Sequence, residues 1–201
     1  YKFALATVFA SWLAKVGDRA IDQIAYMYLY GFQLFFDFAG YSLMAVGASH
    51  IFGIRTPQNF RLPFVAESIK DFWNRWHITL SFWLRDYVYT RLLMRLMKLR
   101  GWSADTANRV ALMVNMLVMG LWHGLEAAYL LYGAFHGALM VATDVWEKNL
   151  PFHARWREHT WYRVASIVIT AHWVLFGFLI FSGRLSWMTP WRSFLLVRMS
   201  R

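Results

Sequence analysis

The sequence contains no cysteine, and this absence excludes several kinds of chemistry at once. Disulfides, thiolate metal sites, a cysteine nucleophile and S-acylation are all ruled out. The sequence also lacks an H-E-x-x-H metal motif, a G-x-S-x-G nucleophile elbow, a phosphate-binding P-loop and a G-x-G-x-x-G dinucleotide motif. His123 and Glu126 alone cannot complete a metal site. We therefore expect no metal and find no support for a metal hydrolase, serine hydrolase, ATPase or NAD enzyme.

Charged residues are scarce as well. They make up 16% of the 201 residues, whereas hydrophobic residues make up 59%. Because a soluble domain is about half apolar and about a quarter charged, this composition favours a membrane protein over a soluble all-α protein with a large core. The 12 tryptophans and 10 tyrosines agree with this interpretation, since amphipathic rings concentrate at the two membrane interfaces.

Acidic residues are few relative to basic ones, with 11 Asp and Glu against 21 Lys and Arg. Nine of the basic residues lie within Arg55–Arg100, where only Glu67, Asp71 and Asp86 oppose them. Cytoplasmic loops of membrane proteins carry such an excess, so the segment is predicted to face the cytoplasm. A nucleic-acid-binding surface is the weaker interpretation, because the basic residues lie between apolar spans.

The apolar stretches predict several helices. A membrane span needs about 20 residues, so Tyr1–Ala14 is short, and Ile21–Ile54 is long enough to be a tilted or broken helix. Three further apolar segments are Val110–Trp122, Leu125–Trp146 and Val164–Phe181. We predict an all-α, polytopic integral membrane protein with transmembrane helices and short re-entrant and interfacial amphipathic helices. Residues 1–201 are expected to form one membrane domain that is part of a longer protein.

The segment Tyr89–Arg100, YTRLLMRLMKLR, predicts an amphipathic helix. At 100° per residue, Arg91, Arg95 and Lys98 share one stripe, and leucines and methionines fill the rest. The segment is too short to cross a bilayer, so we expect it to lie in the membrane interface. Two roles stay open, namely anchoring to anionic lipid and docking of an acidic protein, whose approach charge complementarity accelerates.

Histidines are the best candidates for catalysis, because a neutral imidazole can accept a proton near neutral pH. Surface or structural roles are predicted for four of the seven: His50, His153, His159 and His172. His123 lies in the apolar segment MGLWHGLEAAY, and an ionisable group within a membrane indicates a functional site. A hydrogen bond between two helices is the alternative role for it.

The glycines around these histidines predict close helix packing. Gly120 and Gly124 are four residues apart, a spacing at which small residues let helices approach one another. His136 has a similar frame between Gly133 and Gly137. For His136 we favour a structural role.

Three sequence blocks indicate a family. They are FFDFAGYSLMAVGASHIFGIRTPQNFRLPF (35–64), DFWNRWHITLSFWLRDYVY (71–89) and NMLVMGLWHG (115–124). With them the chain resembles the membrane-bound O-acyltransferase family, strongly over Phe32–Asp144 and more loosely at GFLIFSG, Gly177–Gly183. Alginate O-acetyltransferases of the family tend to read RRWHISLS and continue into a YLYIPLGG-like turn. This chain reads NRWHITLS without that turn, and is more similar to the branch that D-alanylates teichoic acids.

The resemblance implies an activity. D-alanine would pass from a thioester on the phosphopantetheine arm of a carrier protein to a hydroxyl acceptor, in teichoic acid D-alanylation. The family's invariant histidine corresponds to His123, which would act as the general base on that hydroxyl. His77 would orient or polarise the thioester, with Asn74 as its hydrogen-bond partner. Trp76 and Trp122 complete the predicted substrate-binding residues.

The resemblance also implies partners and a location. Carrier proteins are generally acidic, so Arg91, Arg95 and Lys98 become the predicted docking residues for a D-alanyl carrier protein on the cytoplasmic side. Other membrane subunits of the D-alanylation system and membrane lipid are expected partners, and nucleic acid is not. The only expected cofactor is the phosphopantetheine of the donor. The protein would be a multi-pass protein of the bacterial plasma membrane, and this chain would be the C-terminal half of it.

Three other functions stay open. The first is O-acetylation of an exported polysaccharide of the alginate type, which differs in its acyl donor. The second is a non-enzymatic proton-coupled transporter in which a buried histidine relays protons, although no inverted hydropathy repeats are evident. The third is a non-catalytic scaffold that docks partners at the basic helix.

Overall fold

The structure is a computed structural model that describes residues 2–17, 19–99, 101–149 and 155–185. Within these ranges all regular secondary structure is helical and no strand occurs, which confirms the predicted all-α class. The helices are η1 (Lys2–Ala6), α1 (Thr7–Leu13), α2 (Ala20–Ile51), η2 (Pro63–Val65), α3 (Ile69–Trp73), α4 (Ile78–Leu84), η3 (Arg85–Tyr89), α5 (Thr90–Lys98), α6 (Ala104–His123), α7 (Ala127–Asn149) and α9 (Thr160–Phe181).

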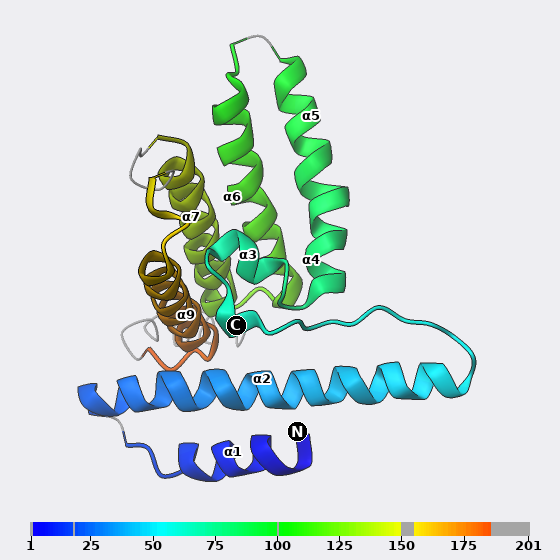
Figure 1. The fold of residues 1–201 in the computed structure, drawn as a ribbon, viewed down its shortest axis with the longest axis vertical. Coiled ribbons are helices and arrows are strands. Elements are labelled where there is room, and N and C mark those ends of the chain that lie inside the picture. The colour runs from blue at the N-terminus through cyan, green and yellow to red at the C-terminus, as the bar shows by residue number, and fades with distance from the viewer. Residues whose placement is uncertain (1, 18, 100, 150–154, 186–201) are drawn as a thin grey trace, which may run out of the picture.

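Helix α2 is a single unbroken helix of 32 residues, so the broken alternative for this segment is wrong. At 1.5 Å per residue it is about 48 Å long, which exceeds the roughly 30 Å of a bilayer core. Asp37 near its centre pairs with the ammonium of Lys2 at 2.5 Å. Helix α1 runs antiparallel beside α2 (Figure 1). In the described part of the chain, α2 and α9 are the two helices long and apolar enough to cross a membrane.

Helices α6 and α7 pack closely through glycine. A Cβ built on Gly120 would lie 3.2 Å from the Cα of Gly133, so neither position has room for a side chain. The predicted role of Gly120 is therefore confirmed. Gly124 has a different role, because it ends α6 with a φ of 147° and turns the chain towards α7. His136 is fully buried, in agreement with the structural role predicted for it.

The segment from α4 to α5 forms one rod, because the residues that join α4, η3 and α5 keep right-handed helical backbone angles. This rod lies side by side with α6, and the two project together away from α2 (Figure 1). The predicted interfacial helix is thus the outer part of a longer arm. Its Leu92, Leu93 and Leu96 are half-buried, whereas Arg91 and Arg95 are exposed.

An aromatic core joins the short helices to the long ones. Trp76 packs against Phe72, Phe60 and Phe178, with ring centroids 5.6, 5.0 and 4.8 Å away. These rings come from α3, from the loop before it and from α9. Such burial holds α3 and the turn after it against α9, and this turn carries the first predicted catalytic residue.

Candidate active site

His77 lies at the turn between α3 and α4, in a backbone conformation that is unusual for a non-glycine residue. Its φ and ψ of 43° and 53° are in the left-handed region, which costs free energy unless the surroundings hold it there. Asn59 supplies two contacts: its backbone carbonyl accepts from the Ile78 N–H at 2.9 Å, and its Oδ1 lies 3.0 Å from His77 Nδ1. Phe38 packs against the imidazole edge-on at 4.8 Å. These contacts determine the position of the ring.

His123 is the last residue of α6, directly before the turn at Gly124. Its imidazole is surrounded by aromatic rings, with the centroids of Trp122 and Phe181 both 4.9 Å away. Tyr132 of α7 adds a third ring at 6.2 Å. In the described part of the chain, no hydrogen bond of the His123 side chain is recorded. The ring is therefore positioned by packing, and its nitrogens are available to a substrate.

A cavity of about 60 Å³ lies between these two histidines. His77 and His123 both line it, and so do Trp76 and Tyr132, while no Asp, Glu, Lys or Arg does. The cavity has space for a small reacting group beside the two imidazoles. The structure thus brings together three residues that the sequence predicted to act together, and adds Tyr132, which it did not indicate.

The remaining two predicted substrate-binding residues lie outside this cavity. Trp122 is 57% exposed, and its ring contacts those of both His77 and His123. Asn74 is exposed and does not take the predicted place beside His77, which Asn59 occupies instead. This pairing could not be predicted from the local sequence, because Asn59 lies 18 residues before His77.

Asn74 lines a second, larger cavity of about 270 Å³. Trp73 lines both cavities, so the two are neighbours. The larger one extends from Trp73 to Lys70, Asn108 and Asp144. It therefore reaches from the wall of the histidine cavity to a group of charged side chains near the start of α6 and the end of α7.

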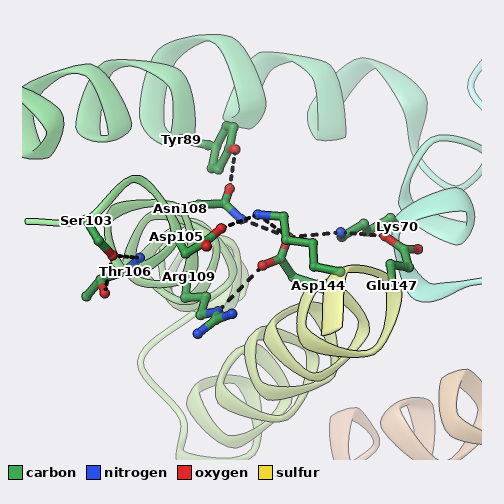
Figure 2. A network of polar contacts seen from close by, with 10 residues as sticks. Lys70, Tyr89, Ser103, Asp105, Thr106, Asn108, Arg109, Asp144 and Glu147 are labelled. Atoms are coloured by element: carbon green, nitrogen blue, oxygen red, sulfur yellow. Dashed lines mark hydrogen bonds and ion pairs between the residues drawn. The ribbon is translucent and has the colours of Figure 1, made fainter. Parts of the chain in front are cut away.

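That charged group is a network centred on Asp144, which is only 2% exposed (Figure 2). Its carboxylate pairs with Lys70 of α3 and Lys148 of α7, both at 3.3 Å. Asn108 of α6 donates to the same carboxylate at 3.0 Å, and Tyr89 donates to Asn108 at 2.6 Å. The network thus joins α3, η3, α6 and α7. The network was not predicted from the sequence, although an acidic residue within the apolar segment Leu125–Trp146 was a visible signal.

The predicted docking residues Arg91, Arg95 and Lys98 are all exposed on α5. The guanidinium of Arg91 lies over the ring of Tyr87 at 5.1 Å. No ion pair of the three is recorded with any part of the chain that the structure describes. Their charges are therefore not neutralised by the described residues.

Other features of the described residues do not add to the site. No group of three or more His, Asp or Glu side chains there is arranged to hold a metal ion. A cavity of about 620 Å³ between α7 and α9 contains none of the predicted residues. His153 lies outside the described residues, as does the basic residue Arg100 that ends the predicted amphipathic segment.

Comparisons with known proteins identify the family of the chain. The family model of the membrane-bound O-acyltransferase family, MBOAT, matches residues 16–187. The chain is 41% identical to a teichoic acid D-alanyltransferase of Streptococcus thermophilus, over 94% of this chain and 51% of that protein. It is also 41% identical to a teichoic acid D-alanyltransferase of Bacillus subtilis, over 92% of this chain and 48% of that protein.

A second group of relatives has a different printed activity. The chain is 38% identical to a probable alginate O-acetylase AlgI of Pseudomonas syringae pv. tomato, over 80% of this chain and 29% of that protein. The chain spans about half the length of the teichoic acid relatives that it matches.

Proposed function

This chain belongs to the membrane-bound O-acyltransferase family, and on that premise we propose that its protein is an acyltransferase that moves D-alanine onto teichoic acid. The observation that carries the proposal is the cavity of about 60 Å³ that His77 and His123 share. Two imidazoles at one small cavity provide a proton acceptor and a second polar group for one reacting centre. The similarity to teichoic acid D-alanyltransferases over more than nine tenths of the chain supports the choice of D-alanine.

In the proposed reaction, the acceptor hydroxyl attacks the carbonyl carbon of a D-alanyl thioester. His123 takes the hydroxyl proton as the new C–O bond forms, and the C–S bond then breaks. The thiolate leaves and receives the proton from the His123 imidazolium, so the products are an ester and a free thiol. No covalent enzyme intermediate is needed. His77 orients the donor, and proton transfer by a positioned histidine contributes roughly 10²- to 10⁴-fold to the rate.

The proposed donor is D-alanine on the phosphopantetheine arm of an acidic carrier protein. The exposed charges of Arg91, Arg95 and Lys98 support docking of such a carrier on α5. The cavity of about 270 Å³ supports a route for the arm, because it begins near the charged network and shares Trp73 with the histidine cavity. Asn74 and Trp122 are proposed to contact the donor on either side of the reacting centre.

We further propose that the protein is a multi-pass protein of the bacterial plasma membrane, with residues 1–201 in one membrane domain. The candidate spans α2 and α9 and the family membership support this location. The basic arm is proposed to face the cytoplasm. Other membrane subunits of the D-alanylation system and lipid are the remaining proposed partners.

The test is a transfer assay with the protein in phospholipid vesicles. A carrier protein charged with D-alanine is offered together with lipoteichoic acid, and acetyl-charged carrier or acetyl coenzyme A is offered in parallel. Ester formation from the D-alanyl carrier that is lost in His123→Ala is the expected result. Transfer that persists in His123→Ala would remove this histidine as the base.

O-acetylation of an exported polysaccharide is the second candidate function. The 38% identity to a probable alginate O-acetylase favours it specifically. When alginate is added to the same assay as a second acceptor, this alternative requires acetyl transfer to alginate and no transfer from the D-alanyl carrier. That outcome would overturn the choice of D-alanine while leaving the acyltransferase proposal in place.

A further inference from the structure

Both polar atoms of the Asn59 side chain have hydrogen-bond partners, and one of these partners is His77. Its Oδ1 accepts from the Thr79 backbone N–H at 3.2 Å and from the Thr79 hydroxyl at 3.0 Å. The same oxygen lies 3.0 Å from His77 Nδ1. Its Nδ2 donates to the hydroxyl of Ser42 on α2 at 3.3 Å. The amide is therefore tied to α2 on one side and to the first turn of α4 on the other.

These contacts determine the tautomer of His77. A backbone N–H is always a donor, so the Asn59 atom that meets Thr79 N must be the oxygen and not the amide nitrogen. Because this oxygen can only accept, the Nδ1 of His77 must carry a hydrogen. In the neutral ring Nε2 is then unprotonated and can only accept a hydrogen bond. In the described part of the chain, no hydrogen bond at Nε2 is recorded.

This tautomer limits what His77 can do. A neutral His77 has no hydrogen at Nε2 to donate, so it cannot polarise the thioester carbonyl by hydrogen bonding. Its Nε2 can instead accept a hydrogen bond from an N–H or O–H group of a ligand in the cavity. Within the transferred D-alanyl group, the amino group is the N–H donor that meets this condition, and it does not compete with the base His123 for the hydroxyl proton.

The rest of the cavity suits such a group. Its walls include the rings of Phe38, Trp76, Tyr132 and Phe181, and aromatic faces attract an ammonium ion. The volume of about 60 Å³ fits a small amino-bearing fragment. The other titratable groups that line the cavity are His123 of α6 and Tyr132 of α7, and no lysine or arginine that would repel a cation lines it.

We propose that Asn59 and His77 form a specificity device that receives the α-amino group of the acyl donor in the histidine cavity. Asn59 is the positioning residue that fixes the ring as the Nδ1–H tautomer, and His77 Nε2 accepts the hydrogen bond from the donor's amino group. The device favours an aminoacyl donor over an acyl donor of the same size that lacks the amino group. This inference rests on the proposed acyl transfer and specifies how its donor is recognised.

The first experiment reads the tautomer without any transfer reaction. The protein is labelled with ¹⁵N-histidine in phospholipid nanodiscs, and the ring signals of His77 are identified by their loss in His77→Gln. We expect Nδ1 to be protonated and Nε2 to be bare in the wild type. A signal for the Nε2–H tautomer would overturn the inference, whether or not the protein transfers D-alanine.

The second experiment compares two donors of nearly equal size, carrier protein charged with D-alanine and carrier protein charged with propionate, with lipoteichoic acid as the acceptor. A site that hydrogen-bonds an N–H group discriminates strongly against an analogue without it, so we expect a preference of about 10²-fold or more for D-alanine. In Asn59→Leu and His77→Gln this preference should fall about tenfold or more, since each variant removes a hydrogen bond of the device. Equal losses with both donors would mean that Asn59 and His77 have no role in donor selection.

Thr79→Val is the matched control, because it removes one hydrogen bond to the same Asn59 oxygen and leaves the bond to His77. Its donor preference should equal that of the wild type, and a loss as large as in Asn59→Leu would overturn the proposal. Asn59→Asp guards against misfolding, since its carboxylate still accepts from Thr79 and His77. That carboxylate favours the imidazolium form of His77, in which Nε2 is protonated and cannot accept.

The preference of Asn59→Asp should therefore be low in mildly acidic buffer and recover as the pH rises, while the wild type changes little over the same range. A variant that merely loosened the fold would show no such recovery. Absence of transfer from either donor by the wild type would instead contradict the proposed function, and the tautomer measurement distinguishes the two failures.

Discussion

The two ends of α6 bury polar side chains in opposite ways. Near its start, the carboxylate of Asp144 is surrounded by Lys70, Lys148 and Asn108 within hydrogen-bonding distance. Near its end, about 22 Å from Asn108 at 1.5 Å per residue, His77 and His123 line a cavity that no charged residue lines. One region neutralises its buried charge, and the other leaves ring nitrogens for a ligand.

The difference separates structural from chemical roles. A buried charge that loses its partners is strongly destabilising, so the Asp144 network holds α3, η3, α6 and α7 together. In the described part of the chain, His123 is held by ring packing and His77 has a hydrogen bond to the neutral Asn59. Removing either imidazole therefore leaves no buried charge unpaired, and it is expected to take away chemistry and little stability. The comparison therefore predicts that variants at the two ends of α6 will differ in what they damage.

The largest effect is expected from His123→Ala. Loss of a positioned base should reduce transfer by roughly 10²- to 10⁴-fold, while the thermal unfolding curve changes little. The measurement is initial transfer rate together with the midpoint of thermal unfolding in detergent. His172→Ala, at an exposed histidine outside the cavity, is the control and should keep its activity. A large fall in the unfolding midpoint of His123→Ala would erase the contrast between the two ends.

Asp144→Ala should have the reverse signature. Its removal leaves Lys70, Lys148 and Arg109 without their common partner, and we expect the free energy of unfolding to fall by about 3 kcal/mol. Transfer per folded molecule should be much less affected. Glu147→Ala, which removes only a half-exposed partner of Lys70, should cost about 1 kcal/mol or less. Equal losses in the two variants would show that burial of Asp144 is not what gives the network its strength.

Reversal of the three charges on α5 tests a site that lies apart from both ends. The triple variant Arg91→Glu, Arg95→Glu and Lys98→Glu should weaken binding of the acidic carrier by about tenfold or more at low salt, because each exposed pair contributes about 0.2–1 kcal/mol. The loss should shrink as the ionic strength rises. Lys15→Glu, exposed at the end of α1, is the control. An unchanged affinity for the carrier would instead favour the alternative role of α5, anchoring to anionic lipid.

Tyr89→Phe should have the smallest effect. It removes only the hydroxyl that donates to Asn108 at 2.6 Å, and we expect a loss of about 1 kcal/mol in unfolding free energy with unchanged transfer. Tyr87→Phe, at an exposed ring on the same segment, should be neutral. A loss of activity in Tyr89→Phe without a loss of stability would indicate that the network communicates with the reaction.

Much of the fold could be predicted, because long apolar runs indicate helices. The segments of α2, α7 and α9 were each located within a few residues, whereas α6 begins at Ala104, well before the predicted Val110. The position of the amphipathic helix that carries Arg91, Arg95 and Lys98 was harder to predict. Its periodicity indicated an amphipathic helix, but a short helix contains no information on whether it lies alone or extends another. Its position as the outer part of the arm beside α6 depends on contacts between distant segments.

The candidate site was predicted in part for the same reason. His77 and His123 stand out because an imidazole is rare and costly among apolar residues, so the sequence alone was enough to propose them as the residues that carry the chemistry. Asn59 and Tyr132 are ordinary in their local context, whereas Asp144 stands out as a carboxylate in an apolar segment. For all three, only the tertiary structure decided which residues they contact. Hydrogen-bond partners and cavity walls are contributed by residues 18 to 74 positions away from those they serve. The local sequence pattern thus indicated the helices and the histidines. Packing between helices that are distant in the sequence decided which residues surround them.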